Sequence, residues 1–347
     1  MLAAVLRDFD RMEIEEVPTP SAAVGEVLVR IVACGICQTD YKAYRGIRRN
    51  VTFPTILGHE AAGTVESVGA GVTHVREGDA VIIMPSAFCG RCRWCREGLT
   101  HYCVAGYVAG GDGARDVRSG AFAEYEVIDG GSVFPKPPEL SFDAAALTEP
   151  LAGAWKGTIG YSRLSVGEDV VVIGVGSIGL LVAMVARAAG AGTVIAVDIS
   201  DYALENARRL AGAHTVNADK EDVRAAVYDM LPDGPDLIIE AAGPIEAVQS
   251  MLSLRRRGTR LNLFGITTPE QARFDAGEAH FLETRMDASF GVTPMAMQQA
   301  IRLMERGLVD PALTITHRFP LTQIGEAMAA MARADRNKVM VDVGGAA

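Results

Sequence analysis

The chain has 347 residues, more than one hydrophobic core usually organises, so its length predicts two domains. Apolar residues make up 49% of it and charged residues 22%, a composition typical of folded α/β proteins. A formal net charge of −10 offers no basic field to nucleic acid or anionic lipid, so we expect neither partner. The apolar run in the amino-terminal segment MLAAVLRDFDRMEIEEV is too short for a signal peptide or a membrane span. We therefore expect a cytoplasmic protein.

Residues 1–149 carry the pattern of a compact, mostly antiparallel β domain. Short apolar segments such as GEVLVRIVACGI and AFAEYEVI alternate with glycine and proline. A proline-rich turn then leads into the helical periodicity of KPPELSFDAAALTEPLAGAWKGTI. We therefore place the end of this domain at Glu149.

Residues 150–286 alternate between strand and helix patterns. The β-branched run VVVIGVG suits a central parallel strand, and the helical segment SIGLLVAMVARAAGA follows it directly. The segments TVIAVD, DLIIEAAG and TRLNLFG repeat the strand pattern between further helices. This alternation predicts a doubly wound parallel sheet, inserted into the β-rich domain to which residues 287–347 return.

Four of the six cysteines follow the pattern C-x2-C-x2-C-x7-C: Cys89, Cys92, Cys95 and Cys103. On one tight loop this spacing suits a closed, structural zinc site with four sulfur ligands. An iron–sulfur cluster is the alternative metal group. Three interleaved arginines are expected to offset the residual negative charge of the thiolates: Arg91, Arg93 and Arg96.

A second set of metal-ligand types gathers at CGICQTD, GHE and TEP, and it contains Cys37, His59, Glu60 and Glu149. Each residue alone has an ordinary interpretation, as a small buried cysteine, a loop histidine or a surface carboxylate. A catalytic zinc needs about three protein ligands and one open position for the substrate oxygen. Cys37, His59 and one carboxylate together predict such a site.

A glycine-rich motif directly follows the first strand of residues 150–286, and it consists of Gly174, Gly176, Ser177, Ile178 and Gly179. Such glycines allow a tight turn and a close approach of a pyrophosphate to the helix N-terminus. Asp198 ends the next strand, where a carboxylate binds a ribose diol and repels a 2′-phosphate, so we expect NAD rather than NADP. Ala242 and Gly243, after a later strand, are further expected cofactor contacts.

In their order, these motifs resemble the zinc-containing medium-chain dehydrogenases, and within them the sorbitol and threonine dehydrogenase branch. The resemblance runs from LGHEAAGTVESVGAGV through the cysteine lobe and VIGVGSIGLL to ITHRFPL. It implies a β-rich, GroES-like catalytic domain with an inserted Rossmann domain, and Cys37 and His59 as zinc ligands. Glu149 stands where other alcohol dehydrogenases carry a cysteine. No cysteine follows Cys103, so Glu60, Glu149 or a water completes the catalytic site.

The resemblance also implies roles for three residues after Cys37. Thr39 would take the proton of the substrate alcohol, and Asp40 would orient His59. Lys42 stands where the family often has a histidine, and it would either relay the proton or hydrogen-bond the cofactor ribose while solvent receives the proton. The ordinary interpretations are a loop hydroxyl for Thr39 and a helix N-cap for Asp40.

The sequence thus predicts an enzyme that transfers a hydride from a secondary alcohol, such as a polyol, to NAD. The segment ASFGV lacks the arginine–tyrosine pair that the polyol branch commonly shows there. A loop at 41–49 carries four basic residues, which makes an anionic alcohol or ketone an alternative substrate, although the ordinary interpretation is a solvated loop. A catalytically silent NAD-binding zinc protein is an alternative of another class. Relatives in this branch are often dimers or tetramers, so we expect a homo-oligomer.

Overall fold

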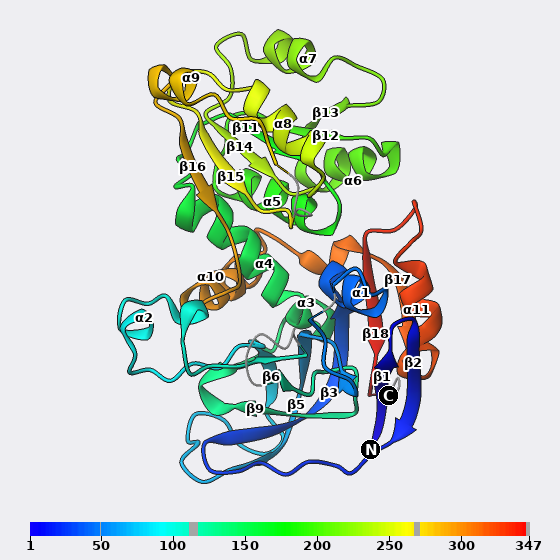
Figure 1. The fold of residues 1–347 in the computed structure, drawn as a ribbon. Helices are drawn as coiled ribbons and strands as arrows, with labels where there is room; N and C mark the ends of the chain where they lie inside the picture. Colours follow the sequence, from blue (N-terminus) through cyan, green and yellow to red (C-terminus); the bar gives the residue numbers. More distant parts are fainter. Residues whose placement is uncertain (49, 111–116, 267–270, 345–347) are drawn as a thin grey trace. The chain divides into compact units, whose positions relative to one another are not determined.

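The computed structural model describes residues 1–48, 50–110, 117–266 and 271–344 (Figure 1). Their contacts separate two compact units, Met1–Glu149 with Val292–Ala347, and Pro150–Gly291. The chain passes from the first unit to the second within helix α4 (Thr148–Trp155) and leaves the second after Gly291. Among the described residues, no helix is both long and apolar enough to cross a lipid bilayer.

The first unit is built around a seven-stranded sheet in the order β10-β6-β5-β3-β18-β17, with β9 also paired to β3. A separate three-stranded sheet has the order β2-β1-β4. Most neighbours are antiparallel, while β17 and β18 run parallel. The strands are β1 (Leu2–Asp8), β2 (Arg11–Glu16), β3 (Glu26–Ile36), β4 (Thr55–Ile56), β5 (Glu60–Val68), β6 (Ala80–Ile83), β9 (Tyr125–Asp129), β10 (Val133–Pro135), β17 (Ile315–Pro320) and β18 (Lys338–Asp342).

Short helices and one small strand pair complete the first unit. The helices are α1 (Gln38–Tyr44), α2 (Arg93–Arg96), α3 (Phe142–Ala146), α10 (Pro294–Glu305) and α11 (Ile324–Ala330), and β7 (Val108–Ala109) pairs with β8 (Val117–Arg118). Helix α11 packs against both β17 and β18, and α3 packs against β3 and β5. The carboxyl-terminal segment therefore belongs to the same core as the amino-terminal strands.

The long strand β3 positions one important side chain of its neighbour β5. Its sequence, EVLVRIVACGI, is buried along most of its length because the sheet is covered on both faces. The register places Gly35 opposite Glu60. A Cβ atom on Gly35 would lie 2.2 Å from Oε2 of Glu60, so the glycine leaves the space that the Glu60 carboxylate occupies.

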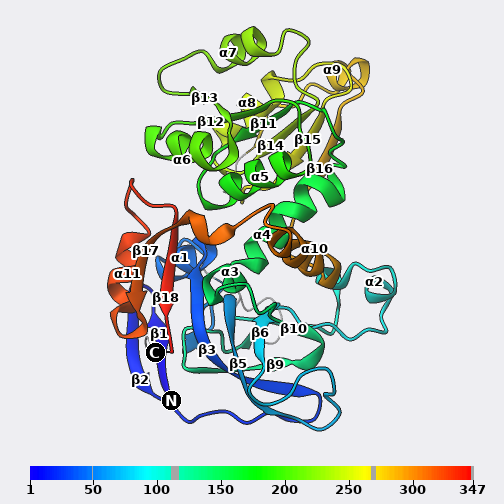
Figure 2. The same ribbon diagram turned by 180° about the vertical axis from the view of Figure 1, so that it is seen from behind.

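The second unit is a six-stranded parallel sheet in the order β13-β12-β11-β14-β15-β16, shown from behind in Figure 2. The strands are β11 (Val170–Ile173), β12 (Val194–Asp198), β13 (His214–Asn217), β14 (Leu237–Glu240), β15 (Arg260–Leu263) and β16 (Arg285–Ala288). The helices after α4 are α5 (Ser177–Ala188), α6 (Asp201–Ala211), α7 (Val223–Met230), α8 (Ile245–Ser253) and α9 (Ala276–Phe281). All six strands are parallel, but the chain adds β12 and β13 on one side of β11 and β14 to β16 on the other. This strand order is that of the predicted doubly wound Rossmann sheet.

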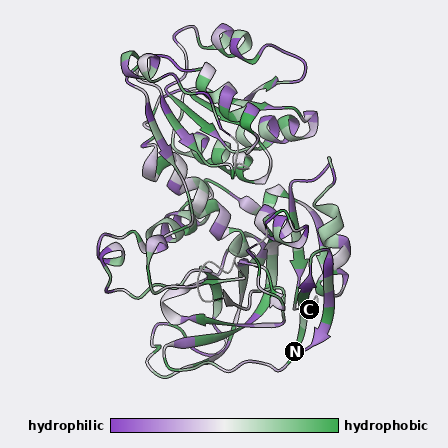
Figure 3. Cartoon of the chain, viewed as in Figure 1, coloured by the Kyte–Doolittle hydropathy of each residue, from purple (hydrophilic) through white to green (hydrophobic). Residues whose placement is uncertain are grey.

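Burial explains why the central strands lack alternation. Strands β11 and β14 are buried at every position, and Figure 3 shows the centre of this sheet as hydrophobic. Helices α5 and α6 contact each other, as do α7 and α8, because right-handed crossovers on either side of the switch point place the two pairs on opposite faces. The expected boundary after residue 286 falls inside β16, which belongs to this sheet.

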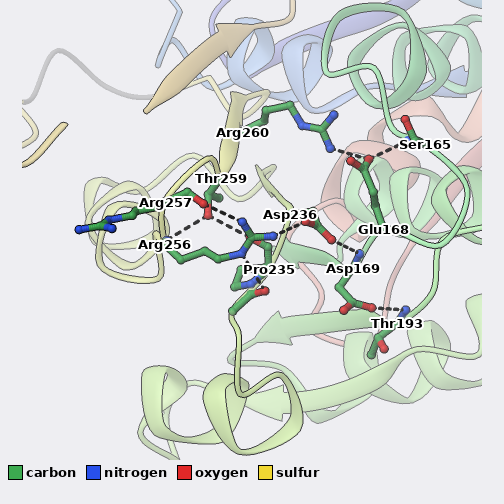
Figure 4. A network of polar contacts seen from close by, with 11 residues as sticks. Ser165, Glu168, Asp169, Thr193, Pro235, Asp236, Arg256, Arg257, Thr259 and Arg260 are labelled. Carbon is green, nitrogen blue, oxygen red and sulfur yellow. Dashed lines mark hydrogen bonds and ion pairs between the residues drawn. The ribbon is translucent and has the colours of Figure 1, made fainter. Parts of the chain in front are cut away.

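A polar network joins the amino ends of these strands, at the edge away from the glycine-rich motif (Figure 4). The backbone N–H of Asp169 donates to Oδ2 of Asp236 at 2.9 Å, and Oδ1 of Asp169 accepts from the backbone N–H of Thr193 at 2.7 Å. The Arg256 guanidinium pairs with the other oxygen of Asp236. The network stabilises the sheet edge and leaves the carboxyl ends of the strands available for a ligand.

Candidate active site and zinc sites

The corner between β3 and α1 holds the first candidate zinc ligand, Cys37, at the N-cap of the helix. Asp40, only 2% exposed, lies in the first turn, and its Oδ2 accepts from the backbone N–H of Cys37 at 2.9 Å. Its Oδ1 accepts from the backbone N–H of Gly58 at 3.3 Å. One carboxylate therefore connects the Cys37 corner to the loop that carries His59.

The His59 imidazole lies between Asp40 and Thr39. Its Nδ1 is 3.3 Å from Oδ1 of Asp40, an ion-pair distance without hydrogen-bond alignment, and its Nε2 is 3.5 Å from Oγ1 of Thr39. Burial works to lower the pKa of His59, but the charges of Asp40 and Cys37 outweigh it and hold that pKa well above the ordinary value. The surroundings of His59 thus favour a positive charge, which a bound metal ion would supply.

Cys37, His59 and Glu60 each present one ligand atom, and these atoms lie within 4.8 Å of one another. A thiolate, an imidazole nitrogen and a carboxylate oxygen are the donor types that zinc binds in proteins. The residues present at this corner therefore fit a zinc ion. Thr39 is half-buried beside them and brings a hydroxyl to the same group.

Glu60 is engaged by a lysine from the far end of the chain. Lys338 Nζ donates to Oε1 of Glu60 at 2.8 Å and to Oε2 at 2.7 Å. Glu60 is 0% exposed and Lys338 is 2% exposed. Burial lowers the pKa of Lys338, but the Glu60 charge reverses the direction and raises it. Lys338 is a site residue that the sequence did not reveal, because only the pairing of β18 with β3 brings it near Glu60.

Glu149 lies in the first turn of α4, half-buried. Burial raises the pKa of its carboxyl to about 7, opposed by the charge of His59 and reinforced by that of Glu60. Glu149 therefore lies within electrostatic range of the Cys37 corner, although it is outside the group of three closely spaced ligand atoms. A cation at that corner would lower the pKa of Glu149 and favour its carboxylate form.

Lys42 lies in the last turn of α1 and is half-buried. Its backbone carbonyl accepts from the N–H of Arg48 at 3.0 Å, which brings the following basic loop back against the helix. The backbone of Arg48 therefore lies next to the last turn of α1, which contains Lys42. Arg49 lies outside the described residues.

The four-cysteine lobe also has the geometry of a metal site, with one sulfur from each of its cysteines within 4.8 Å of the others. The backbone N–H of Cys89 donates to Sγ of Cys103 at 3.3 Å, and that of Cys92 donates to Sγ of Cys89 at 3.4 Å. Backbone donation from Cys95 lowers the pKa of Cys92 to about 6, whereas burial and the neighbouring sulfurs raise that of Cys95 to about 12. Cys92 thus favours the thiolate that zinc requires, and Cys95 would need the positive charge of the metal to reach it. Four sulfurs leave no open position for a substrate.

The expected role of Arg93 in offsetting the charge of this lobe stays a prediction. Its Nε donates to Oε1 of Glu97 at 2.8 Å, and its guanidinium lies 5.2 Å from the Trp94 ring centroid. Its positive charge is therefore paired with a carboxylate on the same short helix. Backbone amides of the lobe donate to its sulfurs as well.

The glycine-rich motif forms the turn between β11 and α5. Gly174 has a φ of +81°, and a Cβ on Gly179 would lie 1.7 Å from the Gly174 carbonyl oxygen, so both positions require glycine. Gly176 is the N-cap of α5, and a Cβ there would meet no atom within 4 Å. Ser177 and Ile178 form the half-buried first turn of the helix. The turn fits a phosphate group because its approach is open and the helix N-terminus is adjacent.

Asp198 supports that turn. Its Oδ2 accepts from the backbone N–H of Val175 at 2.8 Å, and its Oδ1 accepts from that of Ser200 at 2.9 Å. Each carboxylate oxygen keeps a second lone pair with which it can accept a ribose hydroxyl. The carboxylate is therefore already oriented at the end of β12.

Glu240 plays a similar part at the end of β14, and the sequence analysis missed it. Its Oε1 accepts from the backbone N–H groups of Ala242 and Gly243 at 2.8 and 2.6 Å. Ala242 packs closely against Gly174. The signal was a carboxylate closing an apolar strand, the same pattern that identified Asp198. It holds Ala242 and Gly243 beside the glycine-rich turn.

Family models match both parts of this chain. Residues 23–138 match the alcohol dehydrogenase GroES-like domain, and residues 177–306 match the zinc-binding dehydrogenase domain. The L-threonine 3-dehydrogenase of Anaeromyxobacter dehalogenans (strain 2CP-C) is 32% identical over 334 residues, covering 95% of this chain and 94% of that protein. The sorbitol dehydrogenase of Bacillus subtilis (strain 168) is 32% identical, covering 94% of this chain and 92% of that protein. The chain belongs to the zinc-binding alcohol dehydrogenase family.

Solved structures of this family share the whole fold. Alcohol dehydrogenase TADH from Thermus sp. ATN1 superposes with a TM-score of 0.93 at 28% identity, covering 99% of this chain and 100% of that one. A zinc-binding dehydrogenase of Sinorhizobium meliloti 1021, bound to NADP, has a TM-score of 0.91 at 29% identity, covering 99% of each chain. An alcohol dehydrogenase of E. coli CFT073, complexed with NADH, has a TM-score of 0.91 at 26% identity, also covering 99% of each chain. The predictions of the family, of its GroES-like and Rossmann fold class and of a zinc-dependent alcohol dehydrogenase are confirmed.

Proposed function

We propose that this zinc-binding dehydrogenase oxidises the secondary alcohol of a small polyhydroxylated or related hydroxy compound and transfers the hydride to NAD. The observation that carries the proposal is the Cys37 corner, where Cys37 and His59 lie together with a buried carboxylate, that of Glu60, and the Thr39 hydroxyl lies beside them. Bound zinc supplies a Lewis acid that lowers the pKa of the substrate hydroxyl. Bound NAD supplies the hydride acceptor. An intact set of this kind disfavours a catalytically silent NAD-binding protein.

The zinc ligands in this proposal are Cys37, His59 and Glu149. Glu60 has both oxygens engaged by Lys338, so it serves better as a buried counter-charge than as a ligand. Glu149 is half-buried and within electrostatic range of His59. The four-cysteine lobe holds the second, structural zinc. The zinc-binding domain is formed by residues 1–149 with the carboxyl-terminal segment, and the inserted sheet is the NAD-binding domain.

The residues after Cys37 handle the proton. Oγ1 of Thr39 accepts the proton of the substrate hydroxyl, and its position 3.5 Å from Nε2 of His59 keeps it beside the ligand group. Asp40 fixes His59 and the Cys37 corner through its two oxygens. As Thr39 takes that proton it gives up its own, either to solvent or to Lys42 in the neutral amine form.

Asp198 favours NAD over NADP. Its carboxylate, held by two backbone amides, accepts hydrogen bonds from a ribose diol and repels a 2′-phosphate. Ser200, two positions later, is the side-chain N-cap of α6 and offers no positive charge to a phosphate. We therefore expect the catalytic rate with NAD to exceed that with NADP.

The names of these two relatives bear on the substrate. Threonine and sorbitol both contain a secondary alcohol, and threonine also carries a carboxylate. This chain lacks the arginine–tyrosine pair expected of the polyol branch, which argues against sorbitol itself as the substrate. We further propose that the protein acts in the cytoplasm as a homo-oligomer, a dimer or a tetramer, which size-exclusion chromatography with light scattering would resolve.

The test is a screen of NAD reduction over polyols, hydroxy acids and sugar phosphates, on protein whose zinc content has been measured. We expect two zinc ions per chain and reduction of NAD by at least one secondary alcohol. Cys37→Ser should retain one zinc and lose the activity. One zinc per wild-type chain, or no NAD reduction in the whole screen, would contradict the proposal.

A further inference from the structure

The carboxyl end of strand β12 carries more charge than that of Asp198 alone. After Asp198 the chain enters α6, which begins at Asp201, and the neighbouring parallel strand β13 ends at Asn217, directly opposite Asp198. Neighbouring strands lie about 4.8 Å apart. The backbone N–H of Ala218 donates to the Asp198 carbonyl at 3.0 Å. The turn after β13 therefore lies beside the residue whose carboxylate we expect to bind the ribose diol.

That turn brings a lysine to the start of α6. Nζ of Lys220 donates to Oδ2 of Asp201 at 2.6 Å. The other oxygen of Asp201, Oδ1, accepts from Nδ2 of Asn217 at 2.7 Å, and Nδ2 also donates to the Ile199 carbonyl at 3.3 Å. The hydrogen bond from Lys220, and after it that from Asn217, lowers the pKa of Asp201. The Asp201 carboxylate is therefore negatively charged and is oriented toward Lys220.

This ion pair lies at the surface, where a ligand can reach it. The side chain of Lys220 is 60% exposed and that of Asp201 is 69% exposed. An exposed ion pair of this kind contributes little to the free energy of unfolding. Its charges nevertheless act on any ion that binds within a few ångströms. The pair therefore matters more for a ligand at this corner than for the stability of the fold.

The ligands that differ at this corner are NAD and NADP. NADP carries a phosphate on the ribose 2′-oxygen, which in NAD is a hydroxyl that a strand-end carboxylate such as Asp198 binds. The phosphate adds about two negative charges near neutral pH. An available ammonium group would attract it and offset the repulsion from Asp198. In this chain the nearby ammonium of Lys220 is bound to Asp201, whose carboxylate also adds a second negative charge.

We propose that Asp201 determines cofactor choice together with Asp198, because it neutralises Lys220 and so withholds that ammonium from a 2′-phosphate. The inference rests on the proposed function, since it concerns the same NAD-binding domain. Asp201 and Lys220 are specificity-determining residues in this scheme, and neither takes part in the hydride transfer. A neutral residue at position 201 should admit NADP, because it removes one carboxylate and makes the lysine available.

The kinetic test uses Asp201→Asn, whose amide oxygen can still accept from Asn217. We expect the ratio of kcat/KM with NADP to kcat/KM with NAD to rise roughly 5- to 30-fold, as for one unit of charge a few ångströms from a dianion in water. The double variant Asp201→Asn with Lys220→Gln should lose most of that gain, because it has the same net charge as the wild type.

The matched control is Glu205→Gln. Glu205 lies one helical turn farther along α6 and pairs with Arg208, and its side chain is 62% exposed. The substitution removes the same unit of charge from an exposed ion pair on the same helix. We expect it to change the NADP-to-NAD ratio by less than about twofold, because salt screens an exposed charge at that distance.

A binding measurement separates recognition from turnover. Calorimetric titration of the zinc-loaded protein with AMP and with adenosine 2′,5′-bisphosphate reports the effect of the 2′-phosphate without hydride transfer. We expect the wild type and Glu205→Gln to bind AMP at least as tightly as the bisphosphate. Asp201→Asn should shift the affinity ratio toward the bisphosphate by the same factor as in the kinetics. The shift should be smaller at about 0.5 M salt than at about 0.05 M, because ions screen exposed charges.

Four results would overturn the inference. The first is an equal change of the ratio in Asp201→Asn and Glu205→Gln. The second is a full gain in the double variant, which would show that Lys220 does not attract the phosphate. The third is a shift that is independent of salt, as a structural change at the start of α6 would produce. The fourth is tighter binding of the bisphosphate than of AMP by the wild type.

Failure of the proposed function has a different result. Absence of hydride transfer to either dinucleotide, with every alcohol in the screen, would refute the proposed function itself. The two binding ratios do not depend on turnover, so they would still decide the role of Asp201 and Lys220.

Discussion

The two candidate zinc sites of this protein are built in opposite ways. The four-cysteine lobe takes every ligand from one short loop, and its sulfurs receive hydrogen bonds from backbone amides of that same loop. The Cys37 corner draws on a strand end, a loop, helix α4 and a lysine near the carboxyl terminus. The lobe is closed by local geometry, whereas the corner depends on the core of the first unit to hold its charges together.

The largest expected effect separates the chemistry of the two sites. Thr39→Val keeps the side-chain shape but removes the hydroxyl, so we expect kcat to fall about 10²- to 10⁴-fold while two zinc ions remain bound. Steady-state kinetics with zinc analysis measure both quantities. Thr39→Ser retains the hydroxyl and serves as the control. A Thr39→Val enzyme with full activity would remove Thr39 from the proton path.

The next effect concerns the stability of the Cys37 corner. Lys338→Met leaves the Glu60 carboxylate buried without its partner, so we expect the free energy of unfolding to fall by about 3–5 kcal/mol. Urea denaturation of the zinc-loaded protein measures it. The double variant Lys338→Met with Glu60→Gln should recover part of the loss, since no charge then stays unpaired. Equal stability of the single variant and the wild type would contradict a buried ion pair.

A buried carboxyl group of the first unit predicts that the free energy of unfolding depends on pH. Glu126 is 2% exposed, and its Oε2 has no hydrogen-bond partner among the described residues. Burial raises the pKa of Glu126 to about 8, opposed by the charge of His59. Because the folded-state pKa is the higher one, the folded protein binds more protons between the ordinary pKa of 4.5 and about 8, and stability falls as pH rises through this window.

Glu126→Gln should remove that dependence. We expect the variant to match the wild type near pH 5 and to have the larger free energy of unfolding above pH 8, as measured by urea denaturation at several pH values. The difference between the two proteins isolates Glu126 from other titrating groups. A pH-independent difference would show that the Glu126 pKa is not raised by folding.

The smallest expected effect tests the lobe. Arg93→Gln removes an exposed pair with Glu97 whose contribution is at most about 1 kcal/mol. We expect unchanged zinc stoichiometry and a change in the free energy of unfolding below about 1 kcal/mol, because backbone amides stabilise the sulfurs. Loss of one zinc in Arg93→Gln would instead show that Arg93 offsets the charge of the thiolates.

Much of the site was predictable where its signal is local. The spacing of Cys89, Cys92 and Cys95 encodes one loop, and the glycines at 174 and 179 encode one turn, so neither depends on distant parts of the chain. Glu240 has a local signal too, as an acid that ends an apolar strand, and attention to that pattern would have found it.

Lys338 and the choice between Glu60 and Glu149 depend on tertiary structure. Lys338 is 278 positions from Glu60, and only the pairing of β18 with β3 joins them. A lysine opening a strand has no sequence signal for burial, since such residues are usually solvated.

The sequence by itself determined the family, the two candidate metal-ligand sets and the glycine-rich motif, because spacing and residue type carry that information directly. Tertiary structure alone decided which carboxylate has a counter-charge and which acid is buried without a hydrogen-bond partner. Those properties are set by burial and by the distances between charges, and both depend on strands and helices that are far apart along the chain.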